Sequence, residues 1–246
     1  MKKTAFILIV FIAFISCKNK TTDVVQETAI VKDTKTEEAS EWINLFDGSS
    51  YDNWRGYLTK TMHPEWAIED GAMAFMPGQN GGKNIISKEQ FTSFILSLEW
   101  KISEGGNSGI FWGVHEDSKF PEAYETGPEI QVLDNKKHPD AFVGEGTHTA
   151  GALYDMIAPS EDVTNPAGEW NTSIIEVNQT TNTGKVTLNG TEIVNFPVHG
   201  EAWDGMVANS KFKDWKGFGK YPTGHIALQD HGDRVWYRNI KIKKLE

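Results

Sequence analysis

The most constraining feature of this sequence is a two-residue alternation of apolar and polar side chains that recurs from residue 94 to the C-terminal end. In residues 94–102, Leu96, Leu98 and Trp100 fall on one face, and the residues between them are polar. Such alternation is typical of a strand with one buried face. No stretch longer than about ten residues has a helical period, apart from a short turn expected at residues 87–91. Further strands are expected at residues 110–114, 129–133, 173–178, 185–188, 191–196, 225–229 and 235–245.

Turn sequences separate the expected strands. Asn189-Gly190, the strongest short hairpin dipeptide, lies between residues 185–188 and 191–196, and residues 230–233 provide another turn. Many short strands with Gly-containing turns, over about 200 residues of unbroken pattern, predict one all-β domain. We expect a two-sheet antiparallel jelly-roll sandwich. Long loops, which usually carry function in such domains, are expected at residues 55–79, 119–127, 135–149 and 199–222.

The N-terminal residues predict export and lipidation. Two lysines precede an apolar run at residues 5–15, which has the length of a signal-peptide hydrophobic region. The run ends in Phe14-Ile15-Ser16-Cys17, which resembles a bacterial lipobox. We therefore expect residues 1–17 to be a lipoprotein signal peptide with Cys17 as the acylated residue. An ordinary secretory signal that leaves a free Cys is the alternative.

Composition sets the remaining boundaries and the partners. Residues 18–40 are rich in Thr, Lys, Asp and Glu without aromatic residues, so we interpret them as a flexible tether. Residues 41–246 are then the single β-sandwich domain. We expect a lipid-anchored protein of the cell envelope, periplasmic or surface-exposed, which meets the membrane through its anchor only. The formal net charge of −10 excludes nucleic acid as a partner, and the oligomeric state is not predicted.

Several motifs in this order resemble the 3-keto-disaccharide hydrolase domain family. They include Asn44-Leu45-Phe46-Asp47-Gly48, Leu98-Glu99-Trp100-Lys101-Ile102, Gly127-Pro128-Glu129-Ile130-Gln131, Thr149-Ala150-Gly151-Ala152-Leu153-Tyr154-Asp155 and Ile226-Ala227-Leu228-Gln229-Asp230-His231-Gly232. The resemblance spans the chain from about residue 42 onward. It implies a concanavalin A-like lectin/glucanase sandwich. It also implies a carbohydrate substrate, often a glycoside whose glucose ring is oxidised to a ketone at C3.

The candidate catalytic residues centre on one strand. Glu129 and Gln131 are two residues apart, so both side chains point to the same face. The segment also resembles the catalytic strand of sandwich-fold endoglucanases, in which a second carboxylate follows. Here the last position is the shorter Asp134, and retaining glycosidases need two carboxyl groups about 5 Å apart. Ordinary double displacement is therefore disfavoured.

A 3-keto substrate permits another reaction, because the ketone acidifies the hydrogen at C2. A base can then drive elimination of the C1 leaving group, and water adds afterwards. Such a reaction needs a base and a stabiliser of the enolate. The candidate catalytic residues are Glu129, Gln131, Glu99 and His231. The candidate substrate-binding residues are Arg55, Asn107, His138, Tyr154, Asp155 and Gln229.

These residues also have structural interpretations. Arg55 could stack on Trp54, Asn107 after two glycines is typical of a turn, and His138 and His231 could be ordinary loop residues. Glu129 and Gln131 could form a solvated strand face. Trp100 and Trp112 have core parity, whereas Trp66, Trp203 and Trp215 lie in expected loops, where a ring could stack on a sugar.

No cofactor is certain from the sequence. A divalent metal ion is an open alternative, because His225, Gln229 and His231 share one strand face, but no metal-binding motif assigns its ligands. The sequence therefore predicts a glycoside-cleaving enzyme that acts on 3-keto-glucosides or disaccharides by C2 deprotonation, elimination and hydration. The alternatives are a non-catalytic lectin-like module and a conventional endo-glucanase with Asp134 as acid/base.

Overall fold

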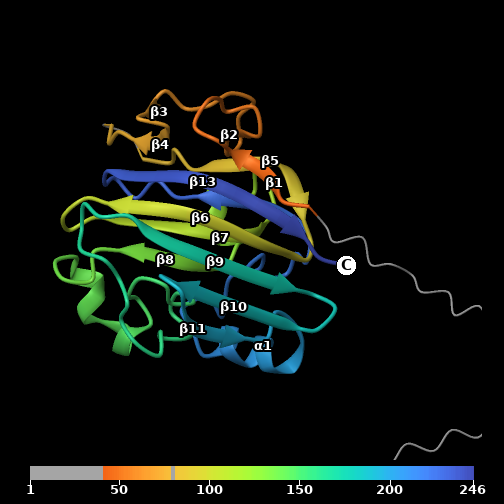
Figure 1. The fold of residues 1–246 in the computed structure, drawn as a ribbon. Coiled ribbons are helices and arrows are strands. Elements are labelled where there is room, and N and C mark those ends of the chain that lie inside the picture. The colour runs from red at the N-terminus through yellow and green to blue at the C-terminus, as the bar shows by residue number, and fades with distance from the viewer. Residues whose placement is uncertain (1–40, 79–80) are drawn as a thin grey trace, which may run out of the picture. The chain divides into compact units, whose positions relative to one another are not determined.

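The computed structural model describes residues 41–78 and 81–246 (Figure 1). The predicted signal peptide, Cys17 and the tether lie outside the described residues. The described part contains one α-helix and three short 3-10 helices. None of the helices in this part is long and apolar enough to cross a membrane.

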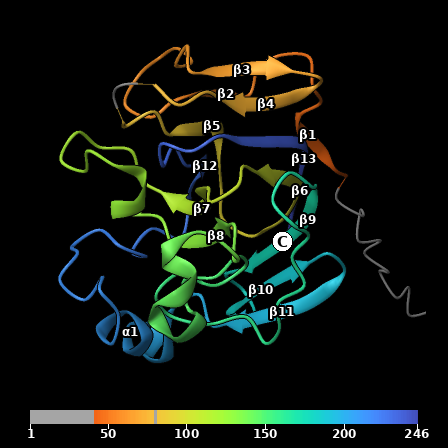
Figure 2. The same cartoon turned by 90° about the vertical axis from the view of Figure 1, so that its left-hand side faces the viewer.

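Two antiparallel sheets form the body of the described domain. The larger sheet has the order β11 (Thr191–Phe196), β10 (Thr183–Leu188), β9 (Asn171–Asn178), β6 (Phe94–Ile102), β13 (Val235–Lys244), β4 (Ala72–Phe75) and β3 (Trp66–Glu69), and β1 (Ile43–Phe46) pairs with β13. The smaller sheet has the order β2 (Trp54–Gly56), β5 (Ile85–Phe91), β12 (Gly224–Leu228), β7 (Asn107–Val114) and β8 (Glu129–Leu133). In Figure 2 the five-stranded sheet lies to the left of the eight-stranded sheet. The predicted two-sheet sandwich is confirmed.

The core lies between the sheets and is built by the alternation seen in the sequence. Apolar residues of β6 and β13 face those of β7, β8 and β12, and Trp100 and Tyr237 are almost completely buried. The Tyr237 hydroxyl is satisfied by a 2.8 Å hydrogen bond with Ser108, as a buried polar group requires. Because strand side chains alternate, the other face of β7, β8 and β12 points outward, where the loops lie.

The turn predictions hold where the residue type dictates the backbone. Asn189 and Gly190 have φ values of 49° and 87°, the positive values that a two-residue type I′ hairpin turn needs. Asp230 closes its turn by accepting a 2.8 Å hydrogen bond from the Gly232 backbone N–H. The first turn joins the paired strands β10 and β11, whereas the second connects β12 in the five-stranded sheet to β13 in the eight-stranded sheet.

Three local expectations are corrected by the structure. The loop expected at residues 55–79 contains β3 and β4, which pair with each other. Residues 87–91, expected as a short helical turn, belong to β5 because their backbone pairs with β2 and β12. The loop expected at residues 199–222 contains α1 (Gly200–Ala208), which buries Trp203 and Val207. Nine residues with two glycines give too short a helical period to be recognised from sequence, and packing of the helix stabilises it instead. The 3-10 helices are η1 (Ala123–Glu125), η2 (Pro139–Phe142) and η3 (Gly144–Gly146).

Candidate active site

A pocket of about 330 Å³ lies on the outer face of the five-stranded sheet. Its floor is formed by β7, β8 and the end of β12, and its walls are formed by loops. In Figure 2 the loops that follow β7 and α1 lie on the outer side of this sheet. The lining residues are Asn107, Tyr124, Glu129, Gln131, Tyr154, Lys211, Phe212, Trp215, Gln229 and His231.

Glu129 is the buried carboxyl group of this pocket. Its side chain points away from the core, as the alternation predicts, yet the residue is only 8% exposed. The space for its carboxylate exists because its diagonal neighbour on β7 is Gly109, two residues before Phe111, the residue that pairs with Glu129; a Cβ at Gly109 would overlap Glu129 Oε1. No described residue donates a hydrogen bond to this carboxylate. Burial raises the pKa of Glu129 to about 8, Lys211 opposes this rise, and Asp140 adds to it.

Three amide side chains surround Glu129 on the pocket floor. Gln131 Oε1 accepts a 3.1 Å hydrogen bond from the Val132 backbone N–H, which leaves its NH₂ group for a ligand. Asn107 Oδ1 and Gln229 Oε1 are buried, and no described residue hydrogen-bonds to them. Unpaired buried oxygens are costly, so these two atoms are suited to accept hydrogen bonds from the hydroxyls of a bound sugar.

The turn interpretation of Asn107 is wrong. Asn107 is the first residue of β7 and is 2% exposed. The turn before it is formed by Gly105, whose φ is 67°. The Asn107 backbone N–H donates a 3.1 Å hydrogen bond to Asp233 Oδ2, which holds the strand end against the turn that follows β12.

Aromatic rings form the pocket walls. The Trp215 ring lies 5.8 Å from that of Tyr124 and 5.1 Å from that of Phe212. On the other side, Tyr154 stacks on His148 at 4.4 Å and its hydroxyl donates a 3.3 Å hydrogen bond to Asp140 Oδ2. Of the three tryptophans expected in loops, only Trp215 lines this pocket. Trp66 belongs to β3 and Trp203 to α1, and both are buried.

A group of three side chains beside the pocket has the composition of a metal site. Ligand atoms of His138, His231 and Asp233 all lie within 4.8 Å of one another, and His231 also lines the pocket. Imidazole and carboxylate together suit a divalent transition metal ion. Asn107 is adjacent to this group, because its backbone N–H donates a hydrogen bond to Asp233 Oδ2. Its buried side-chain Oδ1 has no hydrogen-bond partner among the described residues. His138 Nδ1 accepts a 3.1 Å hydrogen bond from the Asp140 N–H, so binding of a metal through the other ring nitrogen would require this bond to be given up.

A family model, the 3-keto-alpha-glucoside-1,2-lyase-like domain, matches residues 41–243. The chain belongs to this family. A 3-keto-disaccharide hydrolase of Bacteroides thetaiotaomicron is 35% identical over 237 residues, which cover 85% of this chain and 80% of that protein. The membership makes the protein a carbohydrate-acting hydrolase.

Solved structures support the same assignment of the fold. A candidate glycosyl hydrolase of Parabacteroides distasonis aligns with a TM-score of 0.75 and 29% identity over 83% of this chain and 94% of that one. A second one from the same organism aligns with a TM-score of 0.63 and 26% identity over 83% of this chain and 100% of that one. The 3-keto-alpha-glucoside-1,2-lyase-like chain described here therefore has the expected sandwich of the concanavalin A-like type.

The family's sandwich does not bring all the sequence-selected residues together. Glu99 lies on the outer face of the eight-stranded sheet, where its carboxylate accepts 2.7 Å hydrogen bonds from Arg238 and Asn239. Asp155 is close to the pocket, but both of its oxygens are used within the loops, by His148 and by the Lys211 backbone. Asp134 accepts hydrogen bonds from the Gly105 and Lys136 backbone N–H groups. Asp134 does not line the pocket, and among the described residues Glu129 is the only carboxylate that does.

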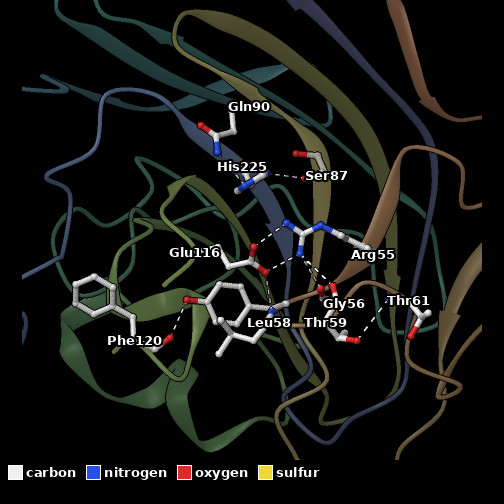
Figure 3. A network of polar contacts seen from close by, with 11 residues as sticks. Arg55, Gly56, Leu58, Thr59, Thr61, Ser87, Gln90, Glu116, Phe120 and His225 are labelled. Carbon is white, nitrogen blue, oxygen red and sulfur yellow. Dashed lines mark hydrogen bonds and ion pairs between the residues drawn. The ribbon is translucent and has the colours of Figure 1, made fainter. Parts of the chain in front are cut away.

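Arg55 forms a separate polar network (Figure 3). Its guanidinium binds both oxygens of Glu116 at 2.6 and 2.7 Å, and Glu116 also accepts a hydrogen bond from the Leu58 backbone. Arg55 therefore pairs with Glu116 instead of stacking on Trp54, which is buried in the core. His225 lies in the same network, bonded to the Ser87 carbonyl and to Gln90. The alternative of a metal held by His225, Gln229 and His231 has no support, because only the last two reach the pocket.

The sequence does not single out three residues of the pocket, Tyr124, Lys211 and Phe212, and it marks Trp215 only as one of several loop aromatics. All four lie in long loops. The length of these loops was a signal for function, but no local pattern shows which loop residues turn inward.

Proposed function

We propose that this chain cleaves 3-keto-glycosides by removing the proton at C2, expelling the C1 substituent and then adding water. The buried carboxyl of Glu129 carries the proposal. A carboxyl with a pKa of about 8 is a much stronger base than an exposed glutamate and is matched to proton transfer near neutral pH. The 35% identical relative is a 3-keto-disaccharide hydrolase, which supports the substrate class.

The proposed steps balance as follows. Ionised Glu129 accepts the C2 proton, and the electrons of the C2–H bond form a C2=C3 double bond while those of the carbonyl bond move to the C3 oxygen. The electrons then return to re-form the ketone and a C1=C2 double bond, and the C1–oxygen bond breaks. The leaving oxygen takes the proton held by Glu129, which returns the carboxyl to its ionised form. Addition of water across C1=C2 completes a net hydrolysis.

The group of three side chains that could bind a metal ion lies beside the pocket. His138, His231 and Asp233 would hold a divalent ion, which when bound would act as a Lewis acid toward an oxygen of the substrate. Asn107, Gln131 and Gln229 would orient the ring by hydrogen bonds to its hydroxyls. Trp215 offers an apolar face for a sugar ring or its leaving group.

The first experiment measures product formation by the full-length protein from a 3-keto-disaccharide and from its unoxidised parent, each with and without a chelator. We expect cleavage of the oxidised sugar only. A C2-deuterated 3-keto substrate should react more slowly, because the C2–H bond breaks in the proposed step. Cleavage of the parent sugar with no isotope effect would contradict the elimination mechanism, and loss of activity with the chelator would place a metal in the reaction.

The pH dependence tests the role of Glu129. If Glu129 must be ionised to act as base, kcat/KM rises with pH and levels off above a pKa of about 8. A rate that falls through the same range would make Glu129 the proton donor instead. Glu129→Gln should abolish turnover and leave sugar binding intact, whereas a purely sugar-binding role would survive this substitution.

We also propose that the chain is anchored in the cell envelope through a lipid on Cys17, with the sandwich on the periplasmic side or at the surface. The apolar run, the position of the single Cys and the polar segment at residues 18–40 support this location. The wild-type protein should incorporate a labelled fatty acid and fractionate with membranes. Cys17→Ser should lose the label, and a label retained by this variant would contradict lipidation at Cys17.

A further inference from the structure

Lys211 brings a positive charge to the rim of the pocket. It follows α1 in the loop at residues 209–222 and lines the same pocket as Glu129. Its ammonium group lies over the Tyr154 ring, 4.0 Å from the centroid, and within 5.3 Å of the Phe212 ring centroid. Aromatic faces hold a cation without neutralising it.

Two loops distant in sequence fix this position. The Lys211 backbone N–H donates a 2.7 Å hydrogen bond to Asp155 Oδ2. Asp155 has a φ of 60°, an uncommon conformation for a residue other than glycine. Its other oxygen lies 2.8 Å from His148 Nε2. His148 in turn stacks on Tyr154, the ring under the Lys211 ammonium.

The charge of Lys211 is available to a ligand. Within residues 41–78 and 81–246 its ammonium forms no ion pair, in contrast to five other lysine or arginine side chains on the surface: Lys119, Lys137, Lys220, Arg234 and Arg238. Its positive charge acts on Glu129 across the pocket. Lys211 is exposed to solvent in the ligand-free pocket, and a bound sugar would cover it. Covering a cation in this way strengthens its interaction with a negative charge on the ligand.

We propose that Lys211 is a catalytic residue that donates a hydrogen bond to the C3 oxygen of the substrate and stabilises the negative charge that develops there when Glu129 removes the C2 proton. This inference rests on the proposed function. Lys211 keeps its protons throughout: the electron pair from the C2–H bond is delocalised onto the C3 oxygen and then expels the C1 substituent. Tyr154 and Asp155 are positioning residues, because they act through Lys211.

The test compares Lys211→Met and Lys211→Arg with Lys213→Met in the full-length protein. Lys213 lies in the same loop, is exposed and does not line the pocket. Removal of one preorganised donor to a developing oxyanion lowers kcat by about 10²–10³-fold. We expect a loss of this size in kcat for Lys211→Met with little change in KM, a smaller loss for Lys211→Arg, and wild-type rates for Lys213→Met.

A second readout does not require turnover. The pKa of the Glu129 carboxyl should be higher in Lys211→Met than in the wild type, because an attractive positive charge has been removed. It is followed by ¹³C NMR of labelled glutamate, with Glu129→Gln to assign the signal. An unchanged Glu129 titration would overturn the proposal, because the two charges would then not share the pocket.

The outcomes separate this inference from the function on which it rests. If the wild type cleaves the 3-keto substrate, Glu129→Gln is inactive and Lys211→Met keeps its kcat or changes only KM, Lys211 has no catalytic role and the proposed function stands. If Lys213→Met loses as much activity as Lys211→Met, the effect belongs to the loop and the inference is wrong. If the wild type cleaves no 3-keto-glycoside, both are overturned.

Discussion

At the scale of single residues, the pocket depends on a glycine that leaves space as well as on the side chains that line it. Glu129 can be buried without an ion pair because its diagonal neighbour on β7 is a glycine, Gly109. The neighbouring floor positions carry amides, which bring hydrogen-bonding capacity without adding a charge that would oppose the carboxyl. This combination desolvates Glu129 and raises its pKa.

Gly109→Ala tests this dependence directly. The added Cβ would overlap the Glu129 carboxylate, so the carboxylate must move while the strand pairing stays intact. A displacement on the order of 1 Å in a catalytic group can cost about 10²-fold in rate. We expect a loss of this order in kcat/KM toward the 3-keto substrate, and a loss of stability of about 1–3 kcal/mol from overpacking.

The matched control is Gly205→Ala on α1, where an added Cβ meets nothing within 4 Å. This variant should keep its activity and gain about 0.5–1 kcal/mol of stability, because alanine favours a helix over glycine. Steady-state kinetics and urea unfolding of both variants provide the comparison. Full activity in Gly109→Ala would show that Glu129 does not need its present position.

At the scale of elements, the sequence predicts those parts of the fold whose residues carry a period. The strands β6, β8 and β11 begin and end as the alternation predicts. The strands β1 to β4 have four residues or fewer, which is too short for a period to be recognised. Their places are set by pairing with strands far along the chain.

The candidate site likewise contains some residues that the sequence could predict and others that it could not. Glu129, Gln131 and Gln229 could be predicted to share a face because they lie on strands or directly beside them, where alternation fixes direction. Lys211 could not, because its loop is held by Asp155, a residue 56 positions earlier in the sequence. Glu99 has the same polar-face parity as Glu129, but parity alone does not tell which of the two sheets a strand joins.

The Arg55–Glu116 pair gives a prediction at this scale, because it connects β2 to the segment that follows β7. Both side chains are largely buried, at 20% and 23% exposure, and the contact is bidentate. Arg55→Met should reduce stability by about 1–3 kcal/mol, because the charged partner is left unpaired. The 3-keto-glycoside activity should remain, since neither residue lines the pocket.

The pH dependence has a definite sign. Arg55 holds the pKa of Glu116 below its ordinary value of 4.5, so the pair stabilises the fold above that pH and the stabilisation is lost as the pH falls through the lowered pKa. The stability difference between wild type and Arg55→Met, measured by urea unfolding, should therefore shrink in acid. A difference that is constant from pH 7 to acid would contradict an ionic origin.

At the scale of the whole domain, the sandwich separates stability from function. The apolar core lies between the two sheets, whereas the pocket lies outside one of them and is closed by loops. The free-energy cost of burying polar groups at the pocket can therefore be offset by the core, which takes no part in the chemistry. One such cost is the burial of Glu129, and it should be visible in the unfolding of the whole domain.

Between about pH 4.5 and about pH 8, the folded domain holds a proton on Glu129 that the unfolded chain has released. The pKa of this group rises from 4.5 to about 8 on folding, so stability falls as the pH rises from about 4.5 to about 8 and is constant above that. The shift corresponds to a loss on the order of 5 kcal/mol. Glu129→Gln has nearly the same shape and does not ionise, so it should lack this part of the pH dependence.

We therefore expect Glu129→Gln to match the wild type in stability near pH 5 and to exceed it by a few kcal/mol at pH 8 to 9, although it cannot catalyse the reaction. Urea unfolding of both proteins across this range measures the difference, and Glu99→Gln, on the outer face of the other sheet, is the control for loss of a glutamate elsewhere. A variant that is equally or less stable than the wild type at pH 9 would mean that Glu129 ionises without cost, and its assignment as a base tuned by burial would fail with it.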